Sequence, residues 1–353
     1  MADKRIKKLA KLIVNYSLNV KKGERILILG NEVSKEYVRL FSTEIIKKGA
    51  VPIVRLLSTA FENKLINSSK SEIISFRNSM LDLAKGTQAV IDIENEPLTS
   101  CSPDLKKLRA CNKLMNPLWD FLIFDRNNYR RATVLLPLKK EARDANMSEK
   151  DFKNYVYNCC FMNWKKFSKK IQKINKLFEK ASEVHLLGEN INLKFSIKGR
   201  NSIIENGKEN VPGGELYMAP LKNSLNGRIK FEYPAFRDCL KISGIFLQFK
   251  NGKVTHYSAD GGQDALKSLL DTDKGARYIG EFGIGINPKA DKITKTWIDE
   301  KNEGTIHLAL GKSYEENNGD NESAVHIDLV KDMHKAKIIL DGKVIQENGK
   351  WKI

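Results

Sequence analysis

The strongest candidate for chemistry in this chain is a histidine and an aspartate near the C-terminus, in the run SAVHIDLV. His326 and Asp328 are two residues apart, and alternation along a β-strand places such side chains on one face. The residues between and beside them are apolar and would point to the opposite face, toward a core. His307 lies in a second apolar, β-prone run, EGTIHLALG. We therefore expect strands that present imidazole and carboxylate groups to a metal ion.

Two glutamates extend this donor set. Glu215 lies in NVPGGELYMAP and Glu281 in YIGEFGIG, where a carboxylate is either exposed on a loop or buried with a cationic partner. Two imidazoles and three carboxylates match the donors of hard or borderline divalent ions. Three carboxylates against two divalent ions leave one positive charge, which a bridging hydroxide neutralises, and such a hydroxide is the nucleophile of a two-metal hydrolase. Spacing alone leaves a shared site open, because these residues are far apart in the chain.

The first half of the chain alternates between helical and strand patterns. Apolar spacing predicts helices over 4–20, 34–48, 69–85, within 103–115, from 148 and over 163–181, and strands over 25–30, 51–56, 89–93 and 132–136. Such alternation is typical of parallel βαβ units. The turn after the first strand reads GNEVSKE and lacks the glycine patterns of nucleotide-binding loops. We predict an α/β N-terminal domain with a mainly parallel sheet over 1–182.

The pattern changes after residue 183. Short strand-like runs separated by Gly, Asn and Pro dominate, with one helix near 264–270 and a C-terminal hairpin whose turn is Asp341-Gly342. This composition predicts an α+β C-terminal domain over 183–353, with a mostly antiparallel or mixed sheet. The candidate ligands all fall in this domain, so we expect it to bind metal.

The bulk composition indicates a globular protein of ordinary hydrophobicity. The net charge of +18 raises the question of nucleic-acid binding, but the lysines alternate with apolar residues at helical spacing, as on a solvated helix face. The 5 cysteines form no metal or disulfide framework, which suits a reducing compartment. No run approaches the roughly 18 apolar residues of a transmembrane helix. We expect a cytoplasmic protein without nucleic-acid or membrane partners.

Four motifs carry a resemblance to a known family. NVPGGELYMAP, GEFGIGINP, HLALGKSY and AVHIDL, in this order, are similar to the motif series of the thermophilic-type metallo-aminopeptidases, the aminopeptidase T and aminopeptidase S family. The N-terminal stretch LAKLIVNYSLNVKKGERILI also resembles that family. The resemblance implies an α/β domain followed by a metal-binding domain, a two-ion site, a homodimer and cleavage of the N-terminal peptide bond of short peptides by a metal-activated water.

The resemblance also implies roles for individual residues. The implied metal ligands are Glu215, Glu281, His307, His326 and Asp328. Tyr314 matches the family's active-site tyrosine and would stabilise an oxyanion. The resemblance assigns no separate general base, and Glu215 or Glu281 could double in that role. The implied ions are zinc, with cobalt or manganese as alternatives. The bridging ligand stays open between the two glutamates and Asp328.

A second reaction class uses part of the same donor set. His307, His326 and Asp328 alone form a two-histidine, one-carboxylate set, which suits a mononuclear non-haem Fe(II) dioxygenase that opens a hydroxylated aromatic ring. Such an iron site does not need the two glutamates, so their presence favours hydrolysis. A nucleic-acid-binding protein is the third hypothesis, and the sequence contains no aromatic-interleaved basic motif to support it.

Overall fold

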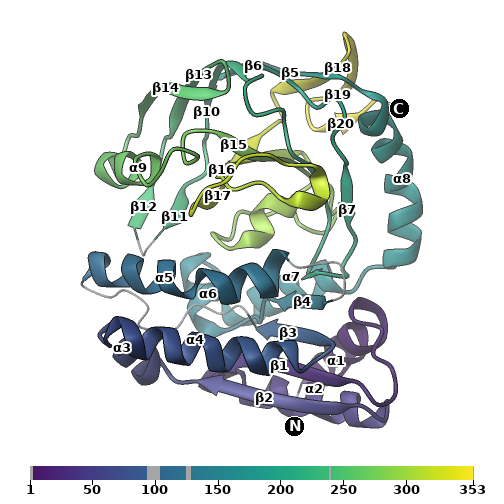
Figure 1. Cartoon of the computed structure of the whole chain (residues 1–353). Coiled ribbons are helices and arrows are strands. Elements are labelled where there is room, and N and C mark those ends of the chain that lie inside the picture. Colours follow the sequence, from purple (N-terminus) through teal and green to yellow (C-terminus); the bar gives the residue numbers. More distant parts are fainter. Residues whose placement is uncertain (1–2, 94–103, 125–128, 238–239, 353) are drawn as a thin grey trace. The chain divides into compact units, whose positions relative to one another are not determined.

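The computed structural model describes residues 3–93, 104–124, 129–237 and 240–352. The chain divides into two compact units (Figure 1). The first contains Met1–Arg143, Met147–Phe161 and Gly207–Gly213, and the second contains Asp144–Asn146, Met162–Asn206 and Gly214–Ile353. This division differs from the expected boundary at residue 182, because it assigns the helix over 164–180 to the second unit. The boundary at 182 stays a prediction, since compactness and independent folding are different criteria of a domain.

A parallel sheet forms the centre of the first unit. Its strand order is β2-β1-β3-β4-β8, and every neighbouring pair is parallel. The strands are β1 (Arg25–Asn31), β2 (Val51–Leu57), β3 (Ala89–Ile93), β4 (Arg130–Val134) and β8 (Asn210–Val211). The helices up to residue 160 are α1 (Lys4–Leu12), α2 (Lys35–Lys47), α3 (Thr59–Ile66), α4 (Lys70–Lys85), α5 (Leu105–Trp119), α6 (Lys139–Asp144) and α7 (Glu149–Cys160). The predicted α/β class with a mainly parallel sheet is confirmed.

Both faces of this sheet are covered. Leu27, Leu29 and Val90 pack in one apolar cluster with residues of α4 and α5, such as Met80 and Met115. The next residues along β1, Ile26 and Ile28, are fully buried as well, because side chains alternate between two covered faces. This burial on both sides explains why β1 reads as an almost continuous apolar run.

The second unit is built from antiparallel strands. In the described residues they form an eight-stranded sheet, β14-β13-β10-β6-β5-β18-β19-β20, a five-stranded sheet, β17-β16-β15-β9-β7, and the pair β11-β12. The strands are β5 (Glu183–Gly188), β6 (Ile191–Ser196), β7 (Ile203–Glu205), β9 (Glu215–Met218), β10 (Asn226–Lys230), β11 (Ala235–Arg237), β12 (Leu240–Ile242), β13 (Phe246–Lys250), β14 (Lys253–Ser258), β15 (Ile279–Gly285), β16 (Thr305–Gly311), β17 (His326–Asp332), β18 (Ala336–Leu340), β19 (Lys343–Glu347) and β20 (Lys350–Trp351). Phe195 on β6 packs edge-on against Phe282 on β15, with ring centroids 5.1 Å apart, so the larger sheets share a core.

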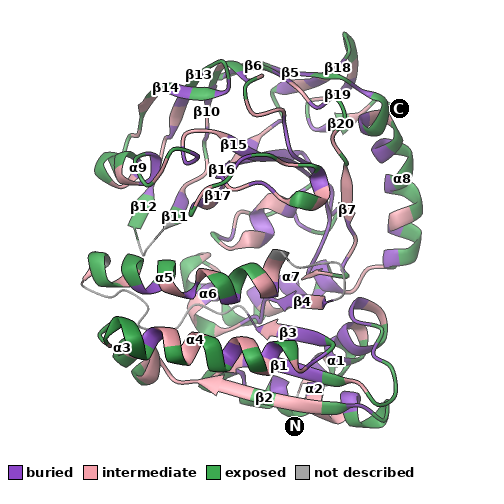
Figure 2. Ribbon diagram, in the orientation of Figure 1, coloured by how far each residue is buried: buried purple, intermediate pink, exposed green. Residues whose placement is uncertain are grey.

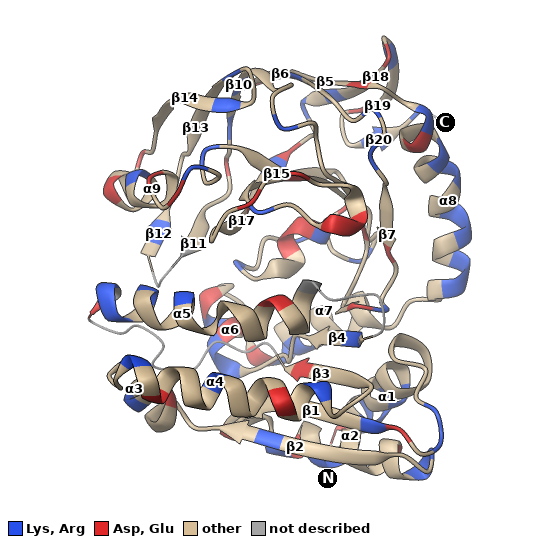
Figure 3. Cartoon of the chain, viewed as in Figure 1, with Lys and Arg blue, Asp and Glu red and all other residues tan. Residues whose placement is uncertain are grey.

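The helices of the second unit are amphipathic. They are α8 (Trp164–Lys180) and α9 (Gln263–Leu270), and the short 3₁₀ helices include η4 (Trp297–Lys301) and η5 (Glu315–Asn317). On α8 an apolar stripe that includes Trp164 and Phe178 is buried, while the lysines are exposed (Figures 2 and 3). The lysine-rich helical pattern therefore forms a solvated face, as predicted. Among the described helices, none combines the length and the apolar character that crossing a membrane requires.

Candidate metal centre

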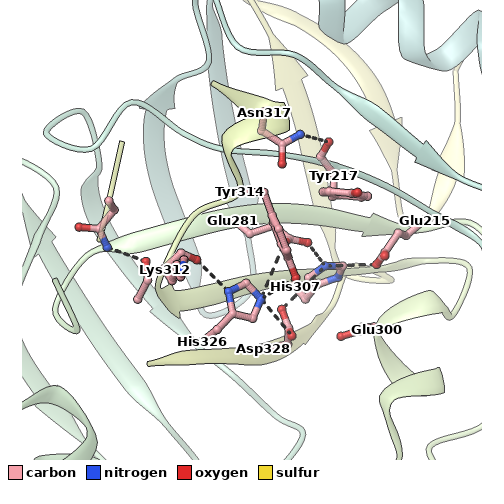
Figure 4. Close-up of polar contacts among 12 residues, drawn as sticks. Glu215, Tyr217, Glu281, Glu300, His307, Lys312, Tyr314, Asn317, His326 and Asp328 are labelled. Atoms are coloured by element: carbon pink, nitrogen blue, oxygen red, sulfur yellow. Dashed lines mark hydrogen bonds and ion pairs between the residues drawn. The ribbon is translucent and has the colours of Figure 1, made fainter. Parts of the chain in front are cut away.

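The five-stranded sheet gathers the residues that the sequence analysis selected. Glu215 begins β9, Glu281 lies on β15, His307 on β16, and His326 and Asp328 on β17. These four strands are consecutive neighbours in the sheet. Their register and the alternation of side chains place all five groups on one face. Figure 4 shows the five side chains and the tyrosine that follows β16 converging on one place.

Small residues on the same face make room for this convergence. His307 lies opposite Gly283 on β15, where a Cβ atom would come within 2.0 Å of the imidazole ring. Ala309 on β16 lies opposite both Glu281 and Asp328. A larger side chain at either position would fill the space in which the donor atoms meet.

The donor atoms lie at distances typical of ligands that share an ion. His307 Nε2 is 3.2 Å from Glu281 Oε1, 3.4 Å from Glu215 Oε2 and 4.0 Å from Asp328 Oδ1. His326 Nε2 is 3.7 Å from Glu281 Oε2 and 3.8 Å from Asp328 Oδ2. Tetrahedral zinc, with bonds of about 2.0–2.2 Å, separates neighbouring donors by about 3.3–3.6 Å. Glu281 is therefore placed with one oxygen toward each histidine.

A glutamate and a lysine that the sequence analysis did not select complete the cluster. Glu300 and Lys301 end η4, and the lysine side chain is only 1% exposed. Lys301 Nζ donates to Glu215 Oε1 at 2.5 Å and to Glu300 Oε1 at 2.7 Å. Two triads of donor atoms fit one ion each by proximity: Glu215 with Glu281 and His307, and Glu300 with His307 and Asp328. The only sequence signal was a charged pair in WIDEK between apolar segments, and a fully buried lysine is rare.

Burial and mutual repulsion shift the protonation of these groups. Burial raises the pKa of Glu215, although the Lys301 ammonium opposes this. Burial also raises the pKa of Asp328, and the negative charge of Glu300 adds to the shift. Burial lowers the pKa of His307, but its hydrogen bond to Glu281 and the surrounding carboxylates outweigh burial and raise it to about 10. Without an ion the cluster thus retains protons, which a divalent cation would displace on binding.

The second histidine is oriented for coordination by its backbone contact. His326 Nδ1 lies 2.8 Å from the carbonyl oxygen of Lys312, so the Nδ1–H donates to that carbonyl. Nε2 then keeps its lone pair and faces Glu281 and Asp328, which is the arrangement of metal-binding histidines. The Tyr314 hydroxyl lies 3.5 Å from the same Nε2, and its ring packs edge-on against the imidazole. Tyr314 therefore lies next to the donor atoms, as its expected role requires.

Three buried donor atoms of the cluster lack a hydrogen-bond partner in the described part of the chain. They are Glu215 Oε2, His307 Nδ1 and Asp328 Oδ1. Buried polar atoms without partners are costly, and metal coordination is one way to satisfy the two carboxylate oxygens. Their positions near His307 Nε2 fit a divalent ion with nitrogen and oxygen ligands. The residues present therefore fit the metal that the donor set implies.

Comparison with known proteins agrees with this chemistry. The model of the thermophilic metalloprotease family M29 matches residues 2–351, which is almost the whole chain. The chain belongs to this family. It is therefore a metalloprotease, a hydrolase whose family implies a divalent metal and peptide substrates. The M29 assignment confirms the resemblance that the four C-terminal motifs indicated.

Individual relatives match this M29 chain over nearly its whole length or over part of it. Aminopeptidase AmpS of Bacillus subtilis is 24% identical, with 97% of each chain covered. Aminopeptidase 2 of Geobacillus stearothermophilus is 32% identical over 40% of each chain. Among solved structures, AmpT from Thermus thermophilus matches with a TM-score of 0.84 at 20% identity and covers 99% of each chain. This match shows that the M29 chain has the AmpT fold.

A second solved structure shows that the fold does not settle the reaction. The 2,5-dihydroxypyridine dioxygenase from Pseudomonas putida matches with a TM-score of 0.63 at 12% identity and covers 99% of the M29 chain and 98% of its own. Related folds therefore occur with different chemistry, and the assignment of function depends on the site. The roles of the individual residues in the cluster remain predictions.

Proposed function

We propose that this M29 protein is an aminopeptidase that removes the N-terminal residue of short peptides with two divalent ions in the C-terminal cluster. The observation that carries the proposal is the number of convergent carboxylates. Glu215 and Glu281 both lie within 3.4 Å of His307 Nε2, and ligand atoms of Glu300, His307 and Asp328 lie within 4.8 Å of one another. Relatives matched over their full length or over part of it are named Aminopeptidase AmpS, Aminopeptidase 2 and Aminopeptidase T, and these names support the same activity.

The residues that would hold the ions are Glu215, Glu281, His307, His326 and Asp328, with Glu300 as a further carboxylate. Zinc fits the nitrogen and oxygen donors, and cobalt or manganese would suit the same set. Bound divalent ions supply Lewis acidity and lower the pKa of a coordinated water. The protein would contribute the positioning of these groups, because the sheet and Lys301 fix the carboxylates before an ion arrives.

Other side chains would act directly on the peptide. The Tyr314 hydroxyl, adjacent to His326, would donate a hydrogen bond to the carbonyl oxygen as negative charge develops on it. A glutamate of the cluster, Glu215 or Glu281, would accept a proton from the attacking water and pass it to the leaving amine. With the ions in place, the free α-amine of the substrate would be held at the cluster, which would restrict cleavage to the N-terminal residue.

The alternative is a mononuclear iron dioxygenase that uses His307, His326 and Asp328. Such a site leaves Glu215 and Glu281 without a role, although both glutamate carboxylates face His307. Metal analysis of protein purified without added metal separates the two hypotheses. The aminopeptidase hypothesis expects close to two zinc-like ions per chain, whereas one iron per chain would favour the dioxygenase.

Replacing Glu281 by glutamine tests the proposal directly. Glu281→Gln keeps the shape of the side chain but removes the negative charge between the two histidines, so we expect hydrolysis of aminoacyl amides to fall by about 10³-fold, or about 4 kcal/mol in the activation barrier. His326→Ala should have a similar effect. Glu303→Gln is the matched control, because Glu303 is exposed and lies close in sequence to His307. Full activity of Glu281→Gln, with its metal content unchanged, would disprove the proposed site.

Two further properties belong to the same proposal. The family resemblance implies a homodimer and the composition a cytoplasmic location, and the cluster described above is assembled within one chain. Light scattering coupled to size-exclusion chromatography measures the oligomeric state. A mass of twice 40.1 kDa is the expected result, and a monomeric mass would contradict the proposed dimer.

A further inference from the structure

A cavity between the parallel sheet and the helices of the first unit shares no lining residue with the metal cluster. Its volume is about 380 Å³, within the range of small-molecule sites. Its lining residues lie at or near the carboxyl ends of β1, β2 and β3 and on α3, α4 and α5; Figure 1 labels these elements. In the strand order β2-β1-β3-β4, the chain reverses its direction of winding at β1 and β3. Ligands of open parallel sheets bind at such a reversal.

Charged side chains lie on the sheet face that forms the floor of the cavity. The register of the three strands aligns Arg55 on β2 and Asp92 on β3 with Leu29 on β1 between them. All three line the cavity. With strands about 4.8 Å apart, the Cα atoms of Arg55 and Asp92 are about 10 Å apart. This face also carries Leu27 of the apolar core, so it is an unfavourable place for two charges.

Neither charge is satisfied by the described part of the protein. The Arg55 side chain forms no hydrogen bond or ion pair there, and its Nε is buried without a partner. The Asp92 carboxylate likewise has no hydrogen bond and no ion pair within 4.0 Å among the described residues, although Arg131 acts on it electrostatically. Burial raises the pKa of Asp92 and also that of Glu62, which lines the cavity from α3. Arg55 and Asp92 form no salt bridge with each other, so both line the cavity without direct neutralisation.

The remaining walls are mainly apolar. Among the lining residues, Phe76 and Met80 of α4 and Met115 and Leu118 of α5 face the floor that carries the two charges. The cavity therefore combines an acceptor for an ammonium group, a fork of donors for a carboxylate and an apolar space.

We propose that this cavity binds a zwitterion with an apolar body, namely an α-amino acid with a large side chain or a short peptide. Arg55 would bind the carboxylate of the ligand, Asp92 its ammonium group, and the helix residues its side chain. This inference does not rest on the proposed aminopeptidase activity, because the ligand chemistry follows from the two unpaired charges and the apolar walls.

Calorimetry with three related probes tests the two-anchor arrangement on the full, metal-loaded protein. L-Phenylalanine carries both charges, phenethylamine only the ammonium group and 3-phenylpropionate only the carboxylate. We expect each single-charge probe to bind at least tenfold more weakly than L-phenylalanine, which corresponds to about 1.4 kcal/mol. Equal affinities for the three probes would overturn the proposal. The dipeptide Phe-Phe is measured in the Glu281→Gln variant, which should not cleave it. Tighter binding of Phe-Phe than of L-phenylalanine would indicate a peptide site, and the reverse order an amino-acid site.

Variants of each anchor assign the probes to the cavity. Arg55→Gln should abolish the advantage of L-phenylalanine over phenethylamine, and Asp92→Asn should abolish its advantage over 3-phenylpropionate. Arg39→Gln on α2 is the matched control, since Arg39 is exposed and does not line the cavity. Binding that survives both anchor variants but disappears in Glu281→Gln would place the amino acid in the metal cluster and overturn the proposal. If the unsubstituted protein binds L-phenylalanine at the cavity but hydrolyses no peptide, only the proposed function is overturned.

Methionine methyl groups give a readout that needs no substitution of a charged residue. Of the 7 methionines in the chain, Met80 and Met115 line the cavity. In protein with ¹³C-labelled methionine methyls, L-phenylalanine should shift the signals of these two residues, assigned by single Met→Leu variants. Shifts confined to other methionines would refute binding at this place, even if Arg55→Gln or Asp92→Asn failed to fold.

Discussion

Replacing Lys301 by methionine measures how far the metal cluster depends on one buried positive charge. The ammonium group bridges Glu215 and Glu300 at 2.5 and 2.7 Å, and the side chain is 1% exposed. Methionine is similar in length and carries no charge, so the substitution removes the ion pairs with little change in packing. Removing one partner of a buried pair destabilises a protein by about 3–5 kcal/mol, because the other charge stays buried. We expect a loss of that size in the free energy of unfolding at neutral pH in EDTA.

Denaturant unfolding followed by tryptophan fluorescence provides the assay. Trp297 is a local reporter, because Lys301 Nζ lies 5.8 Å from the centre of its ring. Saturating zinc should reduce the loss, since the ion brings positive charge to the same carboxylates. Lys274→Met, at an exposed lysine of the same unit, is the control and should change stability by no more than about 0.5 kcal/mol.

Two results would refute this reasoning. A loss below about 1 kcal/mol in EDTA would equal that of an exposed ion pair and would show that water reaches Lys301. An equal loss with and without zinc would show that packing, rather than the missing positive charge, causes the effect.

Three further predictions concern the metal, the tyrosine and a carboxylate that anchors the loop before β17. Removing the metal should lower the free energy of unfolding by about 2.7 kcal/mol, compared with protein in free metal at 100 times the Kd of the metal site. An unchanged Tm would contradict a metal site. Tyr314→Phe should lower kcat by about 10²-fold without changing the metal content, and normal kcat would exclude an oxyanion role. Asp273 accepts hydrogen bonds from the backbone N–H groups of Gly275, Ala276 and Ala324; burial raises its pKa, but these bonds outweigh burial and lower it. The pKa of Asp273 is lower in the folded state than in the unfolded state, so its ionised form stabilises the fold above about pH 4. This stabilisation is lost as the pH falls through the folded-state pKa. Asp273→Asn should therefore reduce the fall of Tm in that acidic range.

Local patterns predict the first unit well, because each βαβ element buries its own apolar face. The strand expected over 25–30 is β1 (Arg25–Asn31), and the helix expected over 69–85 is α4 (Lys70–Lys85), whose N-cap Ser69 forms a capping box with Glu72. Helix α3 was not predicted, since none of its residues is fully buried and its sequence has no apolar stripe. The strand expected over 132–136 begins two residues earlier, where arginines precede the apolar run.

Strand pairing in the second unit could not be predicted from local patterns. β5 pairs with β18, although more than a hundred residues separate them in the chain. Hydrophobic alternation specifies which face of a strand is buried but leaves its neighbour undetermined. The convergence of Glu215 with β15, β16 and β17 depends on such long-range pairing. The family resemblance, rather than residue spacing, supplied that connection.

The unpredicted pair of Glu300 and Lys301 leaves the charge balance of the proposed centre unchanged, because the two charges cancel. Glu215, Glu281 and Asp328 then supply three negative charges when ionised, with both histidines neutral as ligands. One Fe(II) ion would leave one negative charge uncompensated in a buried site, which is unfavourable. Two divalent ions would leave one positive charge, which a single anionic ligand such as hydroxide neutralises. The number of carboxylates, more than the identity of the histidines, therefore favours a two-ion hydrolase over a mononuclear oxygenase on this shared fold.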